Sequence, residues 1–350
     1  MQQIVVNRAD LSAVTVREQP GAELADGQVR LAVHRFGLSA NNISYAIAGD
    51  FLGYWAHFPV DESWGCIPVW GFAEVSESRH GEIAVGERIF GYLPMASELI
   101  VAPDAVGALA FQDESAHRAA GHPWYKRLYR CDADPLYAAD REGVQAIMWA
   151  LFMTGWALAD DLAGTARSVV ISSASSKTAL SAAWALQQSH PDVQVVGLTS
   201  AGNVEFVAAA GVYDAITTYD DLDLAAVEGP AVYVDIAGSQ GVKERVHAAL
   251  GELLGESILI GGTHQGGEEG TGELSGPEPR FFFIPDVAEA ADGGHAAFHD
   301  RFTAAWNGFV PWIETRLELT DDAGADAIVA AYERLLTGNP GPTQAGLFTW

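Results

Sequence analysis

The chain of 350 residues is 49% hydrophobic and 19% charged, which is typical of a folded protein with a sizeable core. Its length exceeds the size at which one hydrophobic core usually stops growing, so we expect two domains. Its formal net charge of −27, from 46 acidic and 19 basic residues, repels phosphate backbones and anionic lipids, so we expect neither nucleic acids nor membranes as partners.

The N-terminal segment MQQIVVNRADLS carries charge where a signal peptide would need an apolar run, so we do not expect secretion. The chain has two cysteines, Cys66 and Cys131, which cannot build a disulfide framework or a zinc site of thiolates. Both features favour a reducing compartment, and we expect the protein in the cytoplasm.

Residues 4–110 alternate apolar and polar side chains in short runs, such as QVRLAVHRF and ERIFGYL, separated by Gly, Pro and Asn turns. The pattern predicts a small antiparallel β domain. Residues 111–142 match neither the helical nor the strand period, and we interpret them as an insertion or a connector between domains.

Residues 143–159 form the longest uncharged apolar stretch. The stretch is slightly too short to span a membrane and contains Gln145 and Thr154, so it predicts a buried helix over 147–162. Helices and strands alternate after it, which predicts a parallel sheet with crossover helices on both faces. The predicted strands are 168–172, 193–198, 215–217, 231–236 and 257–261, and the predicted helices are 178–188, 204–210 and 242–254.

Residues 263–280 are rich in Gly and Glu, and we interpret them as a loop that is either a solvated excursion or a functional lid. A strand-like run FFFIP, a predicted helix over 325–336 and a strand-like tail AGLFTW follow. The sequence shows no internal repeat.

The order of these blocks resembles the medium-chain dehydrogenase/reductase superfamily, in its zinc-free quinone oxidoreductase and enoyl reductase branch. QVRLAVHRFGLSANN resembles that family's strand leading to an Asn-containing turn, and AVGERIFGYLPMASELIVAPD resembles its Val-Gly-Asp-Arg-Val block. ARSVVISSASSKTALSAAWAL and VVGLTSAGNVEFVAAAGVYDAITTYDD resemble its nucleotide-binding units in order and spacing. PLYAADREGVQAIMWALFMTGWALADD and SSASSKT further resemble a bacterial subgroup of zinc-free members.

The resemblance implies an α/β chain with a GroES-like β domain and a Rossmann-type domain that has a doubly wound parallel sheet. The GroES-like catalytic domain would comprise residues 1–140, completed by about 305–350, and the Rossmann nucleotide-binding domain would comprise residues 141–304. The resemblance also implies a homodimer that forms through a sheet edge.

The predicted strand 168–172 leads into SSASSKTA, with serine, alanine and lysine where the superfamily usually has glycines. At such a turn, N–H groups at the start of the helix bind the pyrophosphate of a dinucleotide. We predict that backbone amides, hydroxyls and an ammonium group bind the phosphates here, from Ser173, Ser175, Ser176, Lys177 and Thr178. The alternative is that Lys177 points to solvent and the serines only cap the helix.

The predicted strand 193–198 is followed by Thr199 and Ser200, where an NAD-selective site would have a carboxylate for the ribose 2′-hydroxyl. Because no carboxylate is present and Asn203 is close in sequence, we predict NADPH as the cofactor, with NADH as the alternative. Ser200 and Asn203 are equally interpretable as capping residues. Further predicted cofactor contacts come from the resemblance, at Thr154 and Tyr219, and from the carboxyl ends of predicted strands, at Asp235, Gly238, Gly261 and Gly262.

Residues 80–82 read His-Gly-Glu, the wrong order for the Gly-His-Glu step of the superfamily's catalytic zinc site, so we expect no metal. Without a metal, the resemblance implies hydride transfer to an activated alkene or electron delivery to a quinone, with protein hydrogen bonds to the developing enolate. It places Asn41 or the adjacent Asn42 near the nicotinamide, and Tyr45 and Tyr54 are the nearby phenols that can donate a proton. Each tyrosine is also interpretable as a packing residue.

We therefore expect an NADPH-dependent, zinc-free oxidoreductase that acts on a small, apolar, conjugated molecule such as an enone, an enal or a quinone. Enoyl reductases of this branch have a tyrosine where this chain has Phe51, which counts against a strict enoyl reductase. Two alternatives remain open on the same fold. One is a redox-inactive nucleotide-binding sensor or scaffold, and the other is a non-redox reaction such as an elimination.

Overall fold

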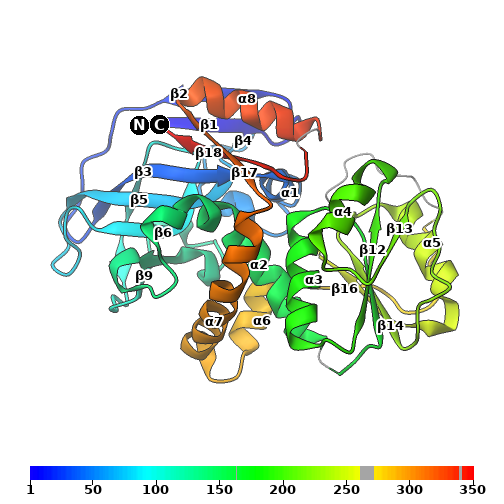
Figure 1. Ribbon diagram of the computed structural model, residues 1–350. Helices are drawn as coiled ribbons and strands as arrows, with labels where there is room; N and C mark the ends of the chain where they lie inside the picture. Colours follow the sequence, from blue (N-terminus) through cyan, green and yellow to red (C-terminus); the bar gives the residue numbers. More distant parts are fainter. Residues whose placement is uncertain (163, 261–271, 339–340) are drawn as a thin grey trace. The chain divides into compact units, whose positions relative to one another are not determined.

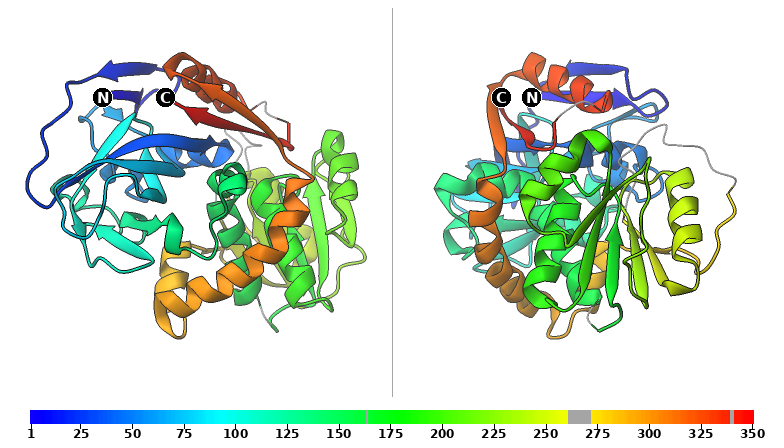
Figure 2. Two further views of the ribbon diagram at one scale, coloured as in Figure 1. Left: turned by 60° about the vertical axis from the view of Figure 1, so that its left-hand side comes forward. Right: turned by 45° about the vertical axis from the view of Figure 1, so that its right-hand side comes forward.

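The computed structural model describes residues 1–162, 164–260, 272–338 and 341–350. They divide into two compact units, one of Met1–Trp149 with Leu317–Trp350 and the other of Ala150–Arg316. Figures 1 and 2 show the strands and helices of each unit. Of the helices in these ranges, none is long and apolar enough to cross a membrane.

The first unit is built mainly of antiparallel strands in two sheets. The smaller sheet has the order β2-β1-β4, and the larger has the order β17-β18-β3-β5-β6-β10-β9-β8 with β7 paired to β3. The strands are β1 (Gln2–Asn7), β2 (Val14–Glu18), β3 (Val29–Leu38), β4 (Trp64–Gly65), β5 (Pro68–Ser78), β6 (Arg88–Pro94), β7 (Glu98–Val101), β8 (Pro103–Asp104), β9 (Ala110–Asp113), β10 (Arg127–Arg130), β17 (Glu318–Ala323) and β18 (Gln344–Thr349), and the helices are α1 (Ala40–Ile47) and α8 (Ala325–Leu336).

Part of the segment 111–142 belongs to the larger sheet, so the interpretation of this part as a connector is wrong. β10 pairs antiparallel with both β6 and β9, and two short 3₁₀ turns lie between β9 and β10 in the chain. Strands of four residues are too short to show an alternating pattern, which is why the sequence did not predict them.

The second unit contains one sheet of parallel strands in the order β13-β12-β11-β14-β15-β16. This is the doubly wound order of Rossmann domains, with the reversal between β11 and β14. The strands are β11 (Ser168–Ile171), β12 (Gln194–Thr199), β13 (Ala215–Thr218), β14 (Ala231–Asp235), β15 (Leu254–Leu259) and β16 (Arg280–Phe281). The helices are α3 (Lys177–Ser189), α4 (Val204–Ala210), α5 (Gln240–Leu250), α6 (Ile284–Ala290) and α7 (Gly294–Glu314), and α2 (Glu142–Asp161) precedes β11.

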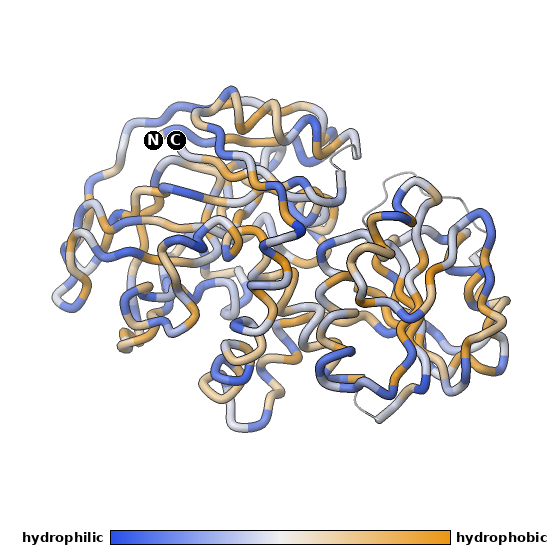
Figure 3. Tube along the Cα trace, in the orientation of Figure 1, coloured by the Kyte–Doolittle hydropathy of each residue, from blue (hydrophilic) through white to orange (hydrophobic). Residues whose placement is uncertain are grey.

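Both faces of the parallel sheet are buried, as the continuous apolar strands predict. Val169 and Ile171 pack on one face with residues of α3, whereas Val170 packs on the other face with residues of α5. Figure 3 shows hydrophobic residues along these strands. The alternation of a β-strand therefore divides the unit into two hydrophobic layers.

Helix α7 was not predicted from the sequence, although its buried aromatic residues Phe298, Phe302, Trp306 and Phe309 recur at helical spacing. The strand-like run FFFIP is strand only at its beginning, because β16 ends at Phe281 and α6 begins at Ile284. Residues 263–271 of the predicted loop lie outside the described residues.

Candidate functional site

The turn between β11 and α3 lies at the carboxyl edge of the parallel sheet, where the strand order reverses (Figure 1). Ser173 in this turn has a φ of +52°, a left-handed conformation that residues other than glycine rarely adopt. Its backbone N–H donates to the hydroxyl of Tyr219, at 2.9 Å, just after β13. The tyrosine therefore stabilises a serine in a conformation that favours glycine.

The first residues of α3 present hydrogen-bond donors at this edge. The backbone N–H groups of Ser175 and Thr178 make no hydrogen bond with other described residues. Ser176 is the N-cap, and its hydroxyl accepts from the N–H of Ala179 at 3.2 Å. Burial lowers the pKa of Lys177, the first residue of α3, to about 8.

The donor set of this turn fits an anionic phosphate group. Two backbone amides at a helix N-terminus, the hydroxyls of Ser175 and Thr178, and one ammonium group all favour negative charge. Asn203 further shapes the turn, because its Nδ2 donates to the hydroxyl of Ser175 at 3.0 Å. Sequence reasoning placed Ser175, Lys177 and Thr178 in one turn and Asn203 after the next strand, and the structure brings Asn203 to that turn.

A buried polar network joins the ends of β11 and β14. Asp235 is completely buried, and its Oδ1 accepts from the Ser172 hydroxyl at 3.1 Å and from the Gly238 N–H at 2.9 Å. Two backbone N–H groups after β14 donate to the same Ser172 oxygen. The Lys243 ammonium lies 3.4 Å from Asp235 Oδ2. The structure thus places Asp235 and Gly238 in a network that fixes the edge of the sheet.

The remaining predicted cofactor residues occupy different environments. Thr199 is buried at the end of β12, and Ser200 is exposed directly after it. The Thr154 hydroxyl donates to the carbonyl oxygen of Ala150 within α2, at 2.9 Å. Gly261 and Gly262 lie outside the described residues.

The three predicted catalytic residues lie together in the first unit. Tyr45 on α1 and Tyr54 in the next turn have ring centroids 4.7 Å apart, and the side chain of Asn41 hydrogen-bonds to Tyr45. The indole N–H of Trp70 donates to the Tyr45 hydroxyl at 3.1 Å. Asn42, the other candidate for the turn asparagine, instead accepts from the N–H of residue 39 and donates to the carbonyl of residue 68.

Three further polar side chains join this cluster, and sequence reasoning missed them. The hydroxyls of Tyr54 and Tyr125 lie 3.4 Å apart, and Tyr92 on β6 packs on Tyr125 with ring centroids 4.6 Å apart. His57 packs edge-on against Tyr92, with centroids 5.4 Å apart. Tyr92 and Tyr125 come from separate parts of the sheet, so no spacing in the sequence could have indicated that they meet.

The cluster is electrically neutral and incompletely hydrogen-bonded. Burial raises the pKa values of Tyr54, Tyr92 and Tyr125, and it lowers the pKa of His57 to about 3. The Tyr92 hydroxyl and His57 Nδ1 are buried and make no hydrogen bond with any residue of the described ranges. Buried polar groups without a partner are rare, so these two atoms set the cluster apart from an ordinary hydrophobic core.

Among residues 1–162, 164–260, 272–338 and 341–350, no group of three or more His, Cys, Asp or Glu side chains could hold a metal ion. A family model described as "Protein of unknown function (DUF2855)" matches residues 36–340. No curated protein matches this chain.

Solved structures share the fold at low sequence identity. CurA from Vibrio vulnificus, in complex with NADPH, is 15% identical, with a TM-score of 0.59 over 100% of this chain and 99% of that chain. The CurF ER cyclopropanase from the curacin A biosynthetic pathway is 16% identical, with a TM-score of 0.62 over 99% of this chain and 98% of that chain. A putative NADPH:quinone reductase from Bacillus thuringiensis is 10% identical, with a TM-score of 0.63 over 100% of this chain and 98% of that chain.

These similarities show the fold of the chain. It is the α/β fold of medium-chain dehydrogenases/reductases, with a GroES-like β unit and a Rossmann-type unit, and the fold class predicted from the sequence is confirmed.

Proposed function

On the premise that this chain belongs to the family described as "Protein of unknown function (DUF2855)", we propose that it is an NADPH-dependent oxidoreductase. The observation that carries this proposal is the turn before α3, at the point where the strand order of the parallel sheet reverses. There the N–H groups of Ser175 and Thr178 and the ammonium of Lys177 can bind the pyrophosphate. CurA, which shares the fold, was solved with NADPH.

The edge beside β12 supports NADPH rather than NADH. The side chains after this strand are the hydroxyls of Thr199 and Ser200 and the amide of Asn203, and none carries a negative charge. A 2′-phosphate meets no repulsion there, whereas a ribose 2′-hydroxyl lacks the carboxylate that NAD sites provide.

The tyrosine cluster supports a carbonyl-conjugated substrate such as an enone or a quinone. A bound reduced nicotinamide would supply a hydride to it. Tyr54, Tyr92 and Tyr125 are neutral phenols, so each can donate a hydrogen bond to the carbonyl oxygen as negative charge develops on it. Asn41 and Trp70 hold the hydroxyl of Tyr45 beside them.

The proposal is tested by titrating the protein with NADPH and NADH under tryptophan fluorescence, followed by NADPH oxidation assays over a panel of enones and quinones. We expect quenching by both nucleotides at lower concentrations of NADPH, and oxidation with at least one member of the panel. If neither NADPH nor NADH quenched the fluorescence, the proposal would be refuted.

The serines of the turn favour a second candidate, a nucleotide-binding protein without turnover. Ser176 uses its hydroxyl to cap the helix, and Ser173 has a conformation that favours glycine, so the turn departs from the glycine-rich form usual in dinucleotide sites. Nucleotide binding without oxidation of any substrate in the panel would support this candidate.

Placing a carboxylate after β12 is expected to reverse the nucleotide preference. In Ser200→Asp, the aspartate would repel the 2′-phosphate of NADPH and accept from the 2′-hydroxyl of NADH. We expect NADPH affinity to fall about tenfold and NADH affinity to rise, since one hydrogen bond to a charged group contributes about 1.5–3 kcal/mol. Fluorescence titration measures both. Ser200→Asn is the uncharged control and should retain the preference for NADPH.

Removing phenol hydroxyls from the cluster is expected to slow turnover and leave nucleotide binding intact. Tyr54→Phe and Tyr125→Phe should each lower kcat about tenfold, because each removes one donor to the developing oxyanion. Tyr332→Phe is the matched control, since this buried tyrosine donates to the carbonyl of residue 11, away from the cluster. Steady-state kinetics on the best substrate of the panel, together with the NADPH Kd, check the prediction. An equal loss in the control would mean that the effect is on stability alone.

A further inference from the structure

Three successive backbone N–H groups in the turn after β11 donate to different partners. The N–H of Ser172 donates to a carbonyl at the end of β14, and the N–H of Ala174 donates to a carbonyl of β12, each at 3.0 Å. Both bonds continue the contacts between neighbouring strands. The N–H of Ser173, which lies between them, donates instead to the hydroxyl of Tyr219 at 2.9 Å. At Ser173 a side chain therefore takes the place of a neighbouring strand.

Ser173 needs such a partner more than the residues on either side of it. Its φ of +52° crowds the β-carbon of any residue other than glycine, so the conformation is strained. Ser173 is also 8% exposed, so its N–H would have poor access to water if the hydrogen bond were lost. The bond to Tyr219 offsets both costs, whereas a glycine would adopt this φ without support.

Tyr219 is itself fixed at the carboxyl edge of the parallel sheet. It directly follows β13, which pairs with β12 (Figure 1), and its N–H donates to the carbonyl of Thr199 at 3.0 Å. Its side chain is half-buried. The hydroxyl is thus held by rigid elements, which a residue that positions another one requires.

The conformation of Ser173 determines where α3 begins. The carbonyl oxygen of Ser173 accepts from the N–H of Ser176, the N-cap of α3, at 2.7 Å. The N–H groups of Ser175 and Thr178, the proposed donors to the pyrophosphate, lie within two residues of this N-cap. A different backbone conformation at Ser173 would move these donors, and misplaced donors bind a phosphate less tightly.

We propose that Tyr219 is a positioning residue of the nucleotide site. Its hydroxyl stabilises Ser173 in the left-handed conformation and thereby holds the donors at the start of α3 in place for the pyrophosphate. Tyr219 replaces in this way the first glycine of a dinucleotide-binding turn. This inference rests on the proposed function, because it assigns the residue that prepares the turn for NADPH.

The test is a double-mutant cycle on the full chain, with NADPH affinity measured by tryptophan fluorescence. Tyr219→Phe should weaken NADPH binding about 3- to 10-fold, the effect of one neutral hydrogen bond. In a protein that already carries Ser173→Gly, the same substitution should change the affinity less than about twofold, because glycine needs no support at this φ. In a protein that carries Ser173→Ala, the loss should be as large as in the wild type, since alanine is strained there too.

Tyr213→Phe is the matched control for the cycle. The Tyr213 hydroxyl donates to the carbonyl of Ala174, in the same turn, at 2.9 Å, so its loss removes a bond of the same kind. Ser173→Gly should not alter the effect of Tyr213→Phe on NADPH affinity. The proposal is wrong if Tyr219→Phe binds NADPH as the wild type does. It is also wrong if the loss persists with Ser173→Gly, because the Tyr219 hydroxyl would then contact the nucleotide directly.

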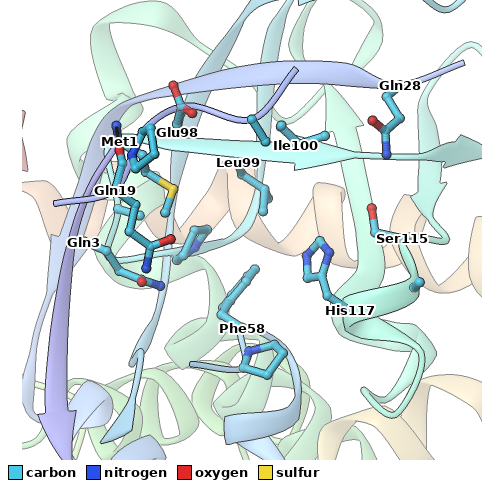
Figure 4. Close-up of a pocket in the computed structure, with 16 residues that line it drawn as sticks. Met1, Gln3, Gln19, Gln28, Phe58, Glu98, Leu99, Ile100, Ser115 and His117 are labelled. Carbon is cyan, nitrogen blue, oxygen red and sulfur yellow. Dashed lines mark hydrogen bonds between the residues drawn. The ribbon is translucent and has the colours of Figure 1, made fainter. Parts of the chain in front are cut away.

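A further control excludes a second place for the nucleotide. The first unit has a pocket of about 480 Å³, lined by residues of β1, β7 and the turn Ala116–Arg118, and its volume is typical of small-molecule sites (Figure 4). His117 lines this pocket. His117→Ala should therefore bind NADPH as the wild type does. A weaker affinity of His117→Ala would place the nucleotide in the pocket and overturn the proposal.

Stability without nucleotide separates this inference from the proposed function. Tyr219→Phe should lower the midpoint of urea denaturation by about 0.3–1 M, and by less in a protein that carries Ser173→Gly. If the wild type bound neither NADPH nor NADH, the proposed function would fail. Equal shifts of the midpoint with and without Ser173→Gly would instead overturn the role of Tyr219 alone.

Discussion

Replacing Lys177 with methionine is expected to weaken NADPH binding about 10- to 100-fold, because it removes a charge-assisted hydrogen bond to the phosphates. Methionine retains most of the apolar length of the side chain. Fluorescence titration of the variant measures the loss. Arg167→Met is the matched control, because this exposed cation stands just before the opposite, amino end of β11.

The pH dependence of binding provides a second readout for Lys177. The pKa of this buried ammonium is about 8, so the free protein loses the charge as the pH rises through that value. The affinity of the wild type for NADPH should therefore fall above pH 8, and the affinity of Lys177→Met should not. Equal affinity or an equal pH profile in the two proteins would show that Lys177 does not contact the nucleotide.

Lys177 also affects the stability of the protein in the absence of ligand, and the sign of this effect follows from its lowered pKa. Because the folded pKa of Lys177 is below its ordinary value of 10.5, the unfolded chain binds more protons between pH 8 and 10.5. Burial of the charge opposes folding below pH 8, and this cost disappears as the pH rises to 10.5. Lys177→Met should be more stable than the wild type at pH 7, and this advantage should shrink over that interval.

The Rossmann-type unit could be predicted from the sequence because each of its central strands is a continuous apolar run. The predicted helix 204–210 has the bounds of α4, and the strand predicted at 231–236 differs from β14 by one residue. The strands β11, β12 and β14 are each followed by a turn and a helix, so local pattern and final topology agree there.

The tyrosine cluster shows what the sequence could not supply. The sequence indicated Tyr45 and Tyr54 because both follow closely after the turn with the asparagines. Tyr92 and Tyr125 instead reach the same cluster from β6 and from a 3₁₀ turn. Their meeting depends on the pairing of β10 with β6, a contact between strands that are too short to show a pattern. Side chains that are brought together by the pairing of distant strands have no regular spacing in the sequence, so a sequence pattern cannot predict their contact.

The same limit applies to Asp235. Its position at the end of a predicted strand suggested a ligand contact, but its carboxylate is completely buried beside Lys243, which is 9% exposed. The hydrophobic pattern of the sequence shows where the strand ends. The direction of the Asp235 side chain depends instead on Ser172 and Gly238, which both donate hydrogen bonds to its Oδ1.

Removing this carboxylate is expected to be strongly destabilising. Asp235→Ala leaves the ammonium of Lys243 buried without its counterion and should lower the free energy of unfolding by about 3–5 kcal/mol. Urea denaturation at pH 7 measures the change. Glu228→Ala is the control, because Glu228 and Arg167 form a pair at 3.3 Å with side chains 73% and 70% exposed, and its loss should cost less than about 1 kcal/mol.

The double variant Asp235→Ala/Lys243→Met separates the pair from the rest of the network. If the unpaired ammonium is the main cost, adding Lys243→Met should recover stability relative to Asp235→Ala alone, because no buried charge then remains. The hydrogen bonds from Ser172 and Gly238 stay lost in both proteins, so recovery should be partial. A double variant as unstable as the sum of its two single variants would show that the ion pair contributes nothing and that the hydrogen bonds hold the ends of β11 and β14 together.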